Sequence, residues 1–442
     1  MTTNTLLRSV QERLARVAQL LQDGQTLQAE LLCLGILKDS PGQVGATLHL
    51  AELALERGDG ARAVEWMESA ARSRPDDAQI GINLAAAHLS AEQPARATTV
   101  LEATLAKHPG HAVGWLMLGQ LRAQLGDPSG ALKASYQAVT RAQREGEWVD
   151  EASTPPALLD AVLDAINRVR RGRRELFFGA FDAVRQQYGG ESVARVERAL
   201  LGYLRDWDST PIDARQRPKF FFFPDLPNTP YHDPYLQPWA RRLQAAFPQI
   251  RADALRIVEE DRRLPNFIPD ELRVEEYVSG DGPMPSWEAF FFYRHGERYD
   301  ANHARCPQTS AALESIELCR IADQAPEILF SVLKPGSHIN AHHGVTNVRL
   351  VMHLPLVVPD GCALNLVDRG EHRWREGEPV MFDDTYLHEA WNRSNRTRIV
   401  LLMDCWNPHL TDVEKLAVRQ LIETITGLQI ADRAARRAEA VA

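Results

Sequence analysis

The sequence predicts a multidomain α + β protein, in which an N-terminal solenoid of helical repeats precedes a β-rich sandwich or jelly-roll domain. Residues recur every 34 positions near the N-terminus, several short strands separated by turn residues follow residue 216, and 442 residues suit about three domains. We expect helical repeats at 1–143, a linker and helical connector at 144–215, a β domain at 216–410, and a C-terminal helix and tail at 411–442.

Four columns of residues define the 34-residue repeat. Ala allows close approach of antiparallel helices, Gly ends a helix, and Pro begins the next unit. The pattern resembles the tetratricopeptide repeat, and residues 115–139 are its clearest copy. We expect about four repeats within 8–143, with an ordinary helical bundle as the alternative. The columns are Pro41, Pro75 and Pro109; Ala29, Ala63, Ala97 and Ala131; Gly24, Gly58, Glu92 and Gly126; and Leu50, Leu84 and Leu118.

The chain changes character twice after the repeats. Residues 144–158 contain charges and a Pro pair, which predicts a linker, and residues 157–207 have apolar residues at helical spacing. From residue 216 onward, short apolar runs between turns predict an antiparallel sandwich or jelly roll, and 411–440 reads as helix. The expected strands are 273–278, 287–293, 327–333, 348–358, 362–367, 379–383 and 397–404.

Composition argues against several classes of protein. A net charge of −9 disfavours a nucleic-acid binder, which needs a basic face. No apolar stretch is long enough for a membrane span, and the N-terminus lacks an apolar signal segment. The five scattered cysteines contain no CxxC, which argues against a disulfide framework or a structural zinc site. We therefore expect a cytoplasmic protein without a nucleic-acid partner or a membrane span.

Histidines are concentrated in the predicted β domain. Six of the 14 histidines fall within 338–388. Three have turn-like contexts and are expected at the surface: His338, His343 and His372. Three others lie beside or within apolar strand segments, where a structural role competes with metal binding: His342, His353 and His388.

The spacing of two of these histidines is typical of a non-haem iron site. Such sites place one His on an early strand, usually with a carboxylate two residues later, and a second His much later in the chain. His388 follows His342 by 46 residues. Gly344 stands where the carboxylate is expected, so spacing alone leaves the metal site open.

Arg398 is the charged residue most suited to a ligand. It enters an apolar run, where an unpaired charge is costly, so we expect an anionic partner. That partner is either a ligand carboxylate, which a guanidinium binds bidentately, or a structural carboxylate such as Asp404 or Asp383. Asp383 and Asp384 could also supply a metal ligand, although hydrogen bonds that orient His388 are favoured.

Three segments together resemble the aspartyl/asparaginyl β-hydroxylase family: 293–302, 331–354 and 382–408. The resemblance covers residues 218–410. It implies a dioxygenase that uses Fe(II), 2-oxoglutarate and dioxygen, on a double-stranded β-helix, which is a cupin-like jelly roll. In that family two histidines bind iron and a glycine replaces the usual carboxylate, in agreement with Gly344.

The resemblance also implies roles for individual residues. One departure concerns Val351, which stands where animal members have a second basic residue, whereas Arg349 is retained. Contacts to the cosubstrate or the polarity of the substrate are therefore expected to differ. The implied roles are iron ligation by His342 and His388, binding of the distal 2-oxoglutarate carboxylate by Arg398, assistance by Ser331 and His353, and lining of the cosubstrate site by Trp287.

The resemblance implies hydroxylation of the β-carbon of an aspartyl or asparaginyl residue. The repeats would offer a concave surface for an extended chain, which favours a peptide or protein substrate. One alternative is the same chemistry on a free amino acid, a lipid acyl chain or another small molecule. A second alternative, from a different class, is a non-catalytic adaptor whose repeats bind a partner.

Overall fold

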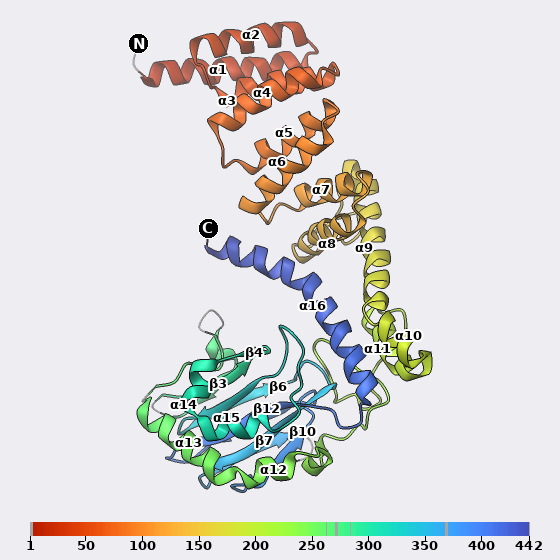
Figure 1. Ribbon diagram of the computed structural model, residues 1–442. Helices are drawn as coiled ribbons and strands as arrows, with labels where there is room; N and C mark the ends of the chain where they lie inside the picture. The colour runs from red at the N-terminus through yellow and green to blue at the C-terminus, as the bar shows by residue number, and fades with distance from the viewer. Residues whose placement is uncertain (1–2, 262, 270–272, 283, 367–369, 442) are drawn as a thin grey trace. The chain divides into compact units, whose positions relative to one another are not determined.

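The chain divides into two compact units (Figure 1). One unit extends to Arg173 and includes the chain from Leu428 onward, and the other comprises Arg174–Gly427. Among the helices in the described ranges, none combines the length and the apolar composition needed to cross a lipid bilayer. The computed structural model describes residues 3–261, 263–269, 273–282, 284–366 and 370–441.

Helices of the first unit pack as successive pairs, which confirms the predicted helical repeats (Figure 1). Apolar clusters join each pair to the next; for example, Leu50 of the third helix packs with Ala29 and Ile36 of the second. The helices are α1 (Thr3–Gln22), α2 (Thr26–Asp39), α3 (Val44–Glu56), α4 (Gly60–Ser73), α5 (Ala78–Ser90), α6 (Pro94–Lys107), α7 (Ala112–Gln124) and α8 (Pro128–Arg144).

The repeat columns have a structural reason. The four alanines of one column lie in the second helix of each pair and are fully buried: Ala29, Ala63, Ala97 and Ala131. The turn between the two helices needs a left-handed residue, which favours glycine. Gly58 and Gly126 have φ values of 74° and 78°, and Glu92 adopts a φ of 55° at the equivalent place.

We predict that enlarging a column alanine destabilises the repeats. Ala97→Leu should lower the free energy of unfolding of the repeat unit by about 1–3 kcal/mol, because the added carbons have no space between closely packed helices. Urea unfolding followed by circular dichroism measures the effect. Ala95→Leu is the matched control, because Ala95 is exposed on the same helix. Equal effects of the two variants would contradict this explanation of the column.

Helices also flank the β-rich region in sequence. The expected helical segment over 157–207 is interrupted, because Gly189 adopts a φ of 86° after the second of its α-helices. The C-terminal helix is present as expected. The bounds are η1 (Pro156–Leu158), α9 (Leu159–Gly179), α10 (Asp182–Tyr188), η2 (Gly190–Val193), α11 (Ala194–Tyr203) and α16 (Asp412–Val441).

Two antiparallel sheets form the body of the second unit, which confirms the predicted jelly-roll class. The larger sheet has the order β1-β10-β7-β12-β5-β3-β4, and the smaller has the order β2-β6-β11-β8-β9. Their strands are β1 (Tyr231–His232), β2 (Val278–Gly280), β3 (Trp287–Arg294), β4 (Glu297–Arg298), β5 (Ile328–Leu333), β6 (Ser337–His342), β7 (Arg349–Val357), β8 (Cys362–Leu366), β9 (Gly370–His372), β10 (Val380–Phe382), β11 (His388–Asn392) and β12 (Arg398–Trp406).

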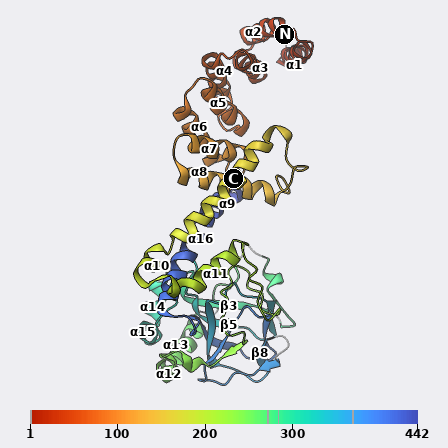
Figure 2. The same cartoon turned by 90° about the vertical axis from the view of Figure 1, so that its right-hand side faces the viewer.

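Helices cover one face of the larger sheet, and the smaller sheet covers the other (Figures 1 and 2). Because side chains alternate along a strand, Leu350 and Met352 of β7 pack in the cluster that contains the helices, whereas Val351 packs between the sheets. The candidate site lies in the layer between the two sheets. The covering helices are η3 (Pro234–Leu236), α12 (Ala240–Ala245), α13 (Phe247–Glu260), α14 (Asp300–Arg305) and α15 (Pro307–Glu314).

Several strand predictions need correction. The expected strand at 273–278 is mainly a 3-10 helix, η4 (Val274–Glu276), followed by β2. Position 367, the last of another expected strand, lies outside the described residues. Five strands were not predicted, and β6 and β11 are the important ones. Their polar sequences, SHINAH and HEAWN, lack the apolar runs on which the prediction depended.

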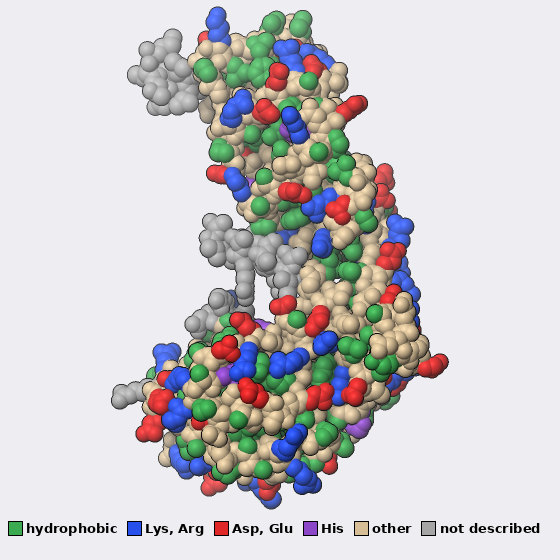
Figure 3. Space-filling view, viewed as in Figure 1, with side chains coloured by type: hydrophobic (Ala, Val, Ile, Leu, Met, Phe, Trp, Pro, Cys, Tyr) green, Lys and Arg blue, Asp and Glu red, His purple; other side chains and the backbone are tan. Residues whose placement is uncertain are grey.

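Charged side chains on the second unit form mixed networks. Arg305 pairs with Glu260 at 3.1 Å and with Asp261 at 2.8 Å, and Arg256 also pairs with Glu260. On the face shown in Figure 3, basic and acidic side chains are interspersed. Exposed pairs of this kind contribute little to stability, so the core between and beside the sheets carries most of it.

Candidate functional site

A cavity of about 170 Å³ lies between the two sheets. The larger sheet contributes side chains from β3, β5, β7, β10 and β12, and the smaller sheet contributes them from β6, β8 and β11. The structure therefore brings together residues that are up to 137 positions apart in the chain. All six residues predicted for the site line this cavity: Trp287, Ser331, His342, His353, His388 and Arg398.

His342 and His388 lie side by side, with ring centroids 4.2 Å apart. Nδ1 of His342 lies 2.8 Å from the backbone oxygen of Asn340, and Nδ1 of His388 lies 3.0 Å from that of Tyr386. A backbone carbonyl only accepts hydrogen bonds, so each Nδ1 carries the hydrogen and each Nε2 keeps its lone pair. Two Nε2 lone pairs are therefore available for a metal ion.

Burial keeps both imidazoles neutral. Desolvation lowers the pKa of His388 to about 3, and it also lowers the pKa of His342. A metal-binding histidine must be neutral, so this environment prepares both rings for ligation without the loss of a proton.

A bulge in β6 turns His342 toward the cavity. Simple alternation would place His342 on the same face as His338 and Asn340. However, His388 pairs with His342 while Ala390 pairs with Ile339, so an advance of three residues along β6 matches an advance of two along β11. His342 and Ile339 consequently both line the cavity.

His338 was expected in a turn, and that prediction is wrong, because His338 lies within β6. Its Nε2 lies 2.8 Å from a carboxylate oxygen of Glu389 on the neighbouring strand β11. His338 does not line the cavity, whereas its strand neighbour Ile339 does.

Asp384 brings a carboxylate to the place that Gly344 leaves open. A Cβ atom added at Gly344 would overlap the Asp384 carboxylate, and the Gly344 amide donates to the Asp384 backbone oxygen at 2.6 Å. Burial raises the pKa of Asp384 to about 7, although the Arg349 charge opposes the shift. Asp384 can therefore lie in the cavity wall only because residue 344 is a glycine without a side chain.

Asp383 does not orient His388, contrary to the sequence-based expectation. Its carboxylate accepts hydrogen bonds from the Thr385 backbone amide at 2.9 Å and from Gln216 Nε2 at 2.7 Å. The backbone carbonyl of Tyr386 orients the His388 ring instead. Asp383 therefore shapes the loop that precedes β11.

Arg398 is buried, with 1% of its surface exposed, and none of the described carboxylates pairs with it. Its Nη1 donates to the Ser331 hydroxyl at 3.1 Å, and its Nε has no acceptor among the described residues. Asp404, one expected structural partner, pairs with Arg349, and Asp383 is occupied as described above. Burial lowers the pKa of Arg398 to about 10. The guanidinium keeps hydrogen-bond donors free for an anionic ligand.

The remaining cavity wall combines polar and aromatic groups. Trp287 Nε1 donates to the Ser331 hydroxyl at 2.9 Å, and its ring stacks on Phe267 with centroids 4.0 Å apart. His353 Nδ1 is buried and has no partner among the described residues, and burial lowers the pKa of this histidine well below its usual value. Val351 adds an apolar surface.

Comparison with known proteins identifies both parts of the chain. Residues 244–408 match the family model described as Aspartyl/Asparaginyl beta-hydroxylase, and residues 20–87 and 82–147 match Tetratricopeptide repeat models. The chain contains an aspartyl/asparaginyl β-hydroxylase domain. Tetratricopeptide repeats precede it. Both resemblances seen in the sequence are therefore confirmed.

Three curated relatives of the hydroxylase domain differ in their named activities. An ornithine lipid ester-linked acyl 2-hydroxylase of Rhizobium tropici is 36% identical over 41% of this chain and 62% of its own length. Aspartate beta-hydroxylase domain-containing protein 2 of Mus musculus is 30% identical over 53% of this chain and 66% of its own length. Aspartyl/asparaginyl beta-hydroxylase of Homo sapiens is 30% identical over 40% of this chain and 22% of its own length. The chain spans less than two thirds of the first two relatives.

Residues 216–219, which precede the sheets, form a brace: they hydrogen-bond to the loop that follows His342 and to the loop that precedes His388. Besides the Gln216–Asp383 bond, the Arg217 amide donates to the Thr385 backbone oxygen at 2.8 Å, and the Lys219 amide donates to that of Gly344 at 3.0 Å. Sequence reasoning missed this brace, because its partners lie more than 120 positions away and no motif marks them.

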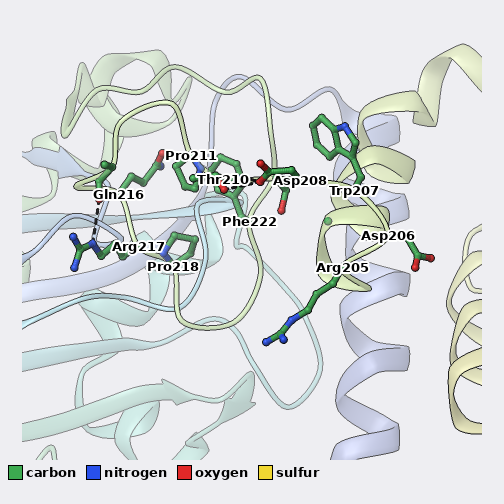
Figure 4. Close-up of a pocket in the computed structure, with 13 residues that line it drawn as sticks. Arg205, Asp206, Trp207, Asp208, Thr210, Pro211, Gln216, Arg217, Pro218 and Phe222 are labelled. Carbon is green, nitrogen blue, oxygen red and sulfur yellow. Dashed lines mark hydrogen bonds between the residues drawn. The ribbon is translucent and has the colours of Figure 1, made fainter. Parts of the chain in front are cut away.

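A second, open cleft of about 730 Å³ lies beside this brace, in the same compact unit as the hydroxylase domain (Figure 4). The loop that follows α11 forms much of its wall, with Trp207 45% exposed and Arg205 at a φ of 62°. Gln216 lies in the wall as well, and its side chain binds Asp383. The cleft is therefore connected to the His388 loop by one direct hydrogen bond.

We predict a pH-dependent stability difference between the wild type and His353→Gln. His353 stays neutral in the fold but protonates in the unfolded chain below about pH 6.5, so its contribution is complete above that pH and is lost as the pH falls. Relative to the variant, the wild type should lose about 2 kcal/mol of unfolding free energy between pH 7.5 and 5. Urea unfolding at each pH tests this, and a pH-independent difference would contradict it.

Proposed function

We propose that the hydroxylase domain is an Fe(II)- and 2-oxoglutarate-dependent dioxygenase that hydroxylates the β-carbon of an aspartyl or asparaginyl residue in a peptide or protein. One observation carries this proposal. One cavity between the two sheets holds two neutral histidines, with Nε2 atoms free, together with a buried arginine that has no carboxylate partner among the described residues.

The histidine pair suits iron. His342 and His388 would hold Fe(II) through Nε2, and imidazole is a ligand that Fe(II) accepts readily. When bound, the iron and 2-oxoglutarate supply oxidative decarboxylation and the transfer of one oxygen atom to a C–H bond. Asp384 lines the same cavity, and burial raises the pKa of its carboxyl group to about 7.

The rest of the cavity suits 2-oxoglutarate. A volume of about 170 Å³ is below the usual range for drug-sized ligands and fits a small dicarboxylate. Arg398 would bind the distal carboxylate, with the Ser331 hydroxyl as a second donor and His353 beside it. Trp287 would limit water access through its stacked ring. Arg349 is neutralised by Asp404, so among the described residues of the cavity wall Arg398 is the cation without a carboxylate partner.

The substrate would approach the cavity from outside, because a volume of about 170 Å³ accommodates little beyond the cosubstrate. The tetratricopeptide repeats support a polypeptide substrate, since repeats of this kind commonly bind extended chains. The five cysteines are unpaired and buried, which fits a reducing cytoplasm in which Fe(II) persists. We therefore place the reaction in that compartment.

A lipid acyl chain is the second candidate substrate. The relative from Rhizobium tropici, named as an acyl 2-hydroxylase, is 36% identical, against 30% for the two aspartate-hydroxylase relatives reported above. The cavity chemistry is the same for both candidates. The difference would lie in the outer surface, where the cleft with Trp207 offers an exposed aromatic group.

We predict that the histidine pair is needed to bind iron and 2-oxoglutarate together. Anaerobic addition of both to the wild type should produce a weak visible charge-transfer band, and air should yield succinate. His342→Ala and His388→Ala should each abolish the band, because either change removes half of the protein ligands. His338→Ala, on β6 but outside the cavity, is the matched control. A band that persists in both alanine variants would refute this ligand assignment.

We predict one-oxygen mass gain in a polypeptide substrate. Peptides rich in Asp and Asn, and separately an acyl-chain lipid, are incubated with the full chain, Fe(II), 2-oxoglutarate and air, and analysed by mass spectrometry. Gain of one oxygen at a peptide Asp or Asn supports the first candidate, and gain on the acyl chain selects the second. Succinate formation without either product points to another small molecule, and no succinate with any substrate favours the non-catalytic adaptor.

A further inference from the structure

Trp374 lies directly beside the arginine of the cavity. It follows β9 in a loop that leads to β10, and only 5% of its surface is exposed. The Arg398 Cζ atom lies over its ring, 5.1 Å from the centroid, and the His353 ring centroid lies 5.8 Å away. Trp374 does not line the cavity itself, whereas Arg398 and His353 do. It therefore stands behind the residues that meet the ligand.

We propose that Trp374 is a positioning residue that fixes the Arg398 guanidinium and so sets the length of dicarboxylate that the cavity accepts. This inference rests on the proposed function, since it assumes that a 2-oxo dicarboxylate occupies the cavity. A site with this geometry should accept the five-carbon 2-oxoglutarate and discriminate against the six-carbon 2-oxoadipate.

The guanidinium is held by only two groups among the described residues. On one side, Nη1 donates to the hydroxyl and the backbone oxygen of Ser331, at 3.1 and 3.3 Å. On the other side, the face of Trp374 supports the positive charge, as an aromatic ring does for a desolvated cation. Since no described carboxylate pairs with Arg398, the ring is the group that stops the guanidinium from moving away from the cavity.

Unpartnered nitrogen atoms at this place indicate that a ligand completes it. Arg398 Nε and His353 Nδ1, on two residues that line the cavity, are both buried and have no partner among the described residues. Buried polar groups in native proteins are almost always hydrogen-bonded. A cluster of such groups around one guanidinium is therefore consistent with a site that a multivalent acceptor, such as a carboxylate, fills on binding.

The loop that carries Trp374 is firmly anchored, so the ring can act as a fixed wall. The Gly377 amide donates to the Pro355 backbone oxygen at 2.9 Å, and Gln244 Nε2 donates to the Gly377 oxygen at 2.9 Å. The Glu376 carboxylate accepts from the Val358 amide, also at 2.9 Å. These bonds attach the loop to β7 and to a covering helix. A smaller side chain at 374 would consequently leave space into which Arg398 could retreat.

Equilibrium binding to the full chain tests the proposal. Under anaerobic conditions with Co(II) in place of Fe(II), calorimetry measures the dissociation constants of 2-oxoglutarate and 2-oxoadipate. The wild type should prefer 2-oxoglutarate by at least about tenfold. Trp374→Leu should weaken 2-oxoglutarate binding about tenfold and bring the two constants close together. Trp374→Phe, which keeps a smaller ring, should reduce the preference about threefold.

Trp391→Leu is the matched control. Trp391 is similarly buried, at 6%, and supports the Arg393 guanidinium at 4.2 Å, but it does not line or adjoin the cavity arginine. This variant should leave the preference between the two acids unchanged. The Co(II) absorption spectrum of each variant reports whether the histidine pair still binds metal. If Trp374→Leu does not fold, Trp374→Phe decides the question.

Each outcome separates this inference from the proposed function. If the wild type binds Co(II) but neither dicarboxylate, the proposed function fails and the role of Trp374 fails with it. If the wild type binds 2-oxoglutarate but the Trp374 substitutions weaken the binding of both acids equally, only the positioning role is overturned. The same holds if the substitutions change the binding of neither acid. A loss of preference confined to the Trp374 variants supports it.

Discussion

The buried charge of Arg398 is the constraint on which the rest of the site depends. A guanidinium without a carboxylate partner is costly inside a protein, and its lowered pKa reflects that cost. The surrounding structure offsets it with the Ser331 hydroxyl and the Trp374 ring rather than with an acid. Such an arrangement is expected where a ligand supplies the missing anion, because a permanent salt bridge would occupy the donors.

A second arginine of the same cavity shows the contrast. Arg349 is paired with Asp404, and although burial lowers its pKa, the charges of Asp404, Asp384 and other nearby groups together outweigh burial and raise it. Arg349 and Arg398 occupy inward positions on adjacent strands β7 and β12, so only their partners distinguish them. Arg349 therefore forms part of the cavity wall, whereas the donors of Arg398 remain open to a ligand. Asp384, held where Gly344 has no side chain, completes the polar rim.

The histidine pair depends on loops as much as on strands. With two protein ligands, a metal site has less intrinsic rigidity than one with three, so the approach of the two rings must be fixed by the surrounding chain. Backbone carbonyls orient both imidazoles, and the segment at 216–219 hydrogen-bonds to the loops that follow His342 and precede His388. The adjacent open cleft shares Gln216 with this brace, so a molecule bound there would lie one hydrogen bond from the His388 loop.

Local periodicity in the sequence determined the repeats and the apolar strands, whereas the six predicted site residues followed from short motifs and the family resemblance; all six are among the residues that line the cavity. The sequence did not show β6, its bulge, or the inward turn of His342, since these follow from pairing with a strand 46 positions away. Nor did it decide between Asp404, Asp383 and a ligand as the partner of Arg398. Only the tertiary structure assigned both carboxylates elsewhere, because the competition for a buried charge is settled by which groups the fold brings within hydrogen-bonding distance.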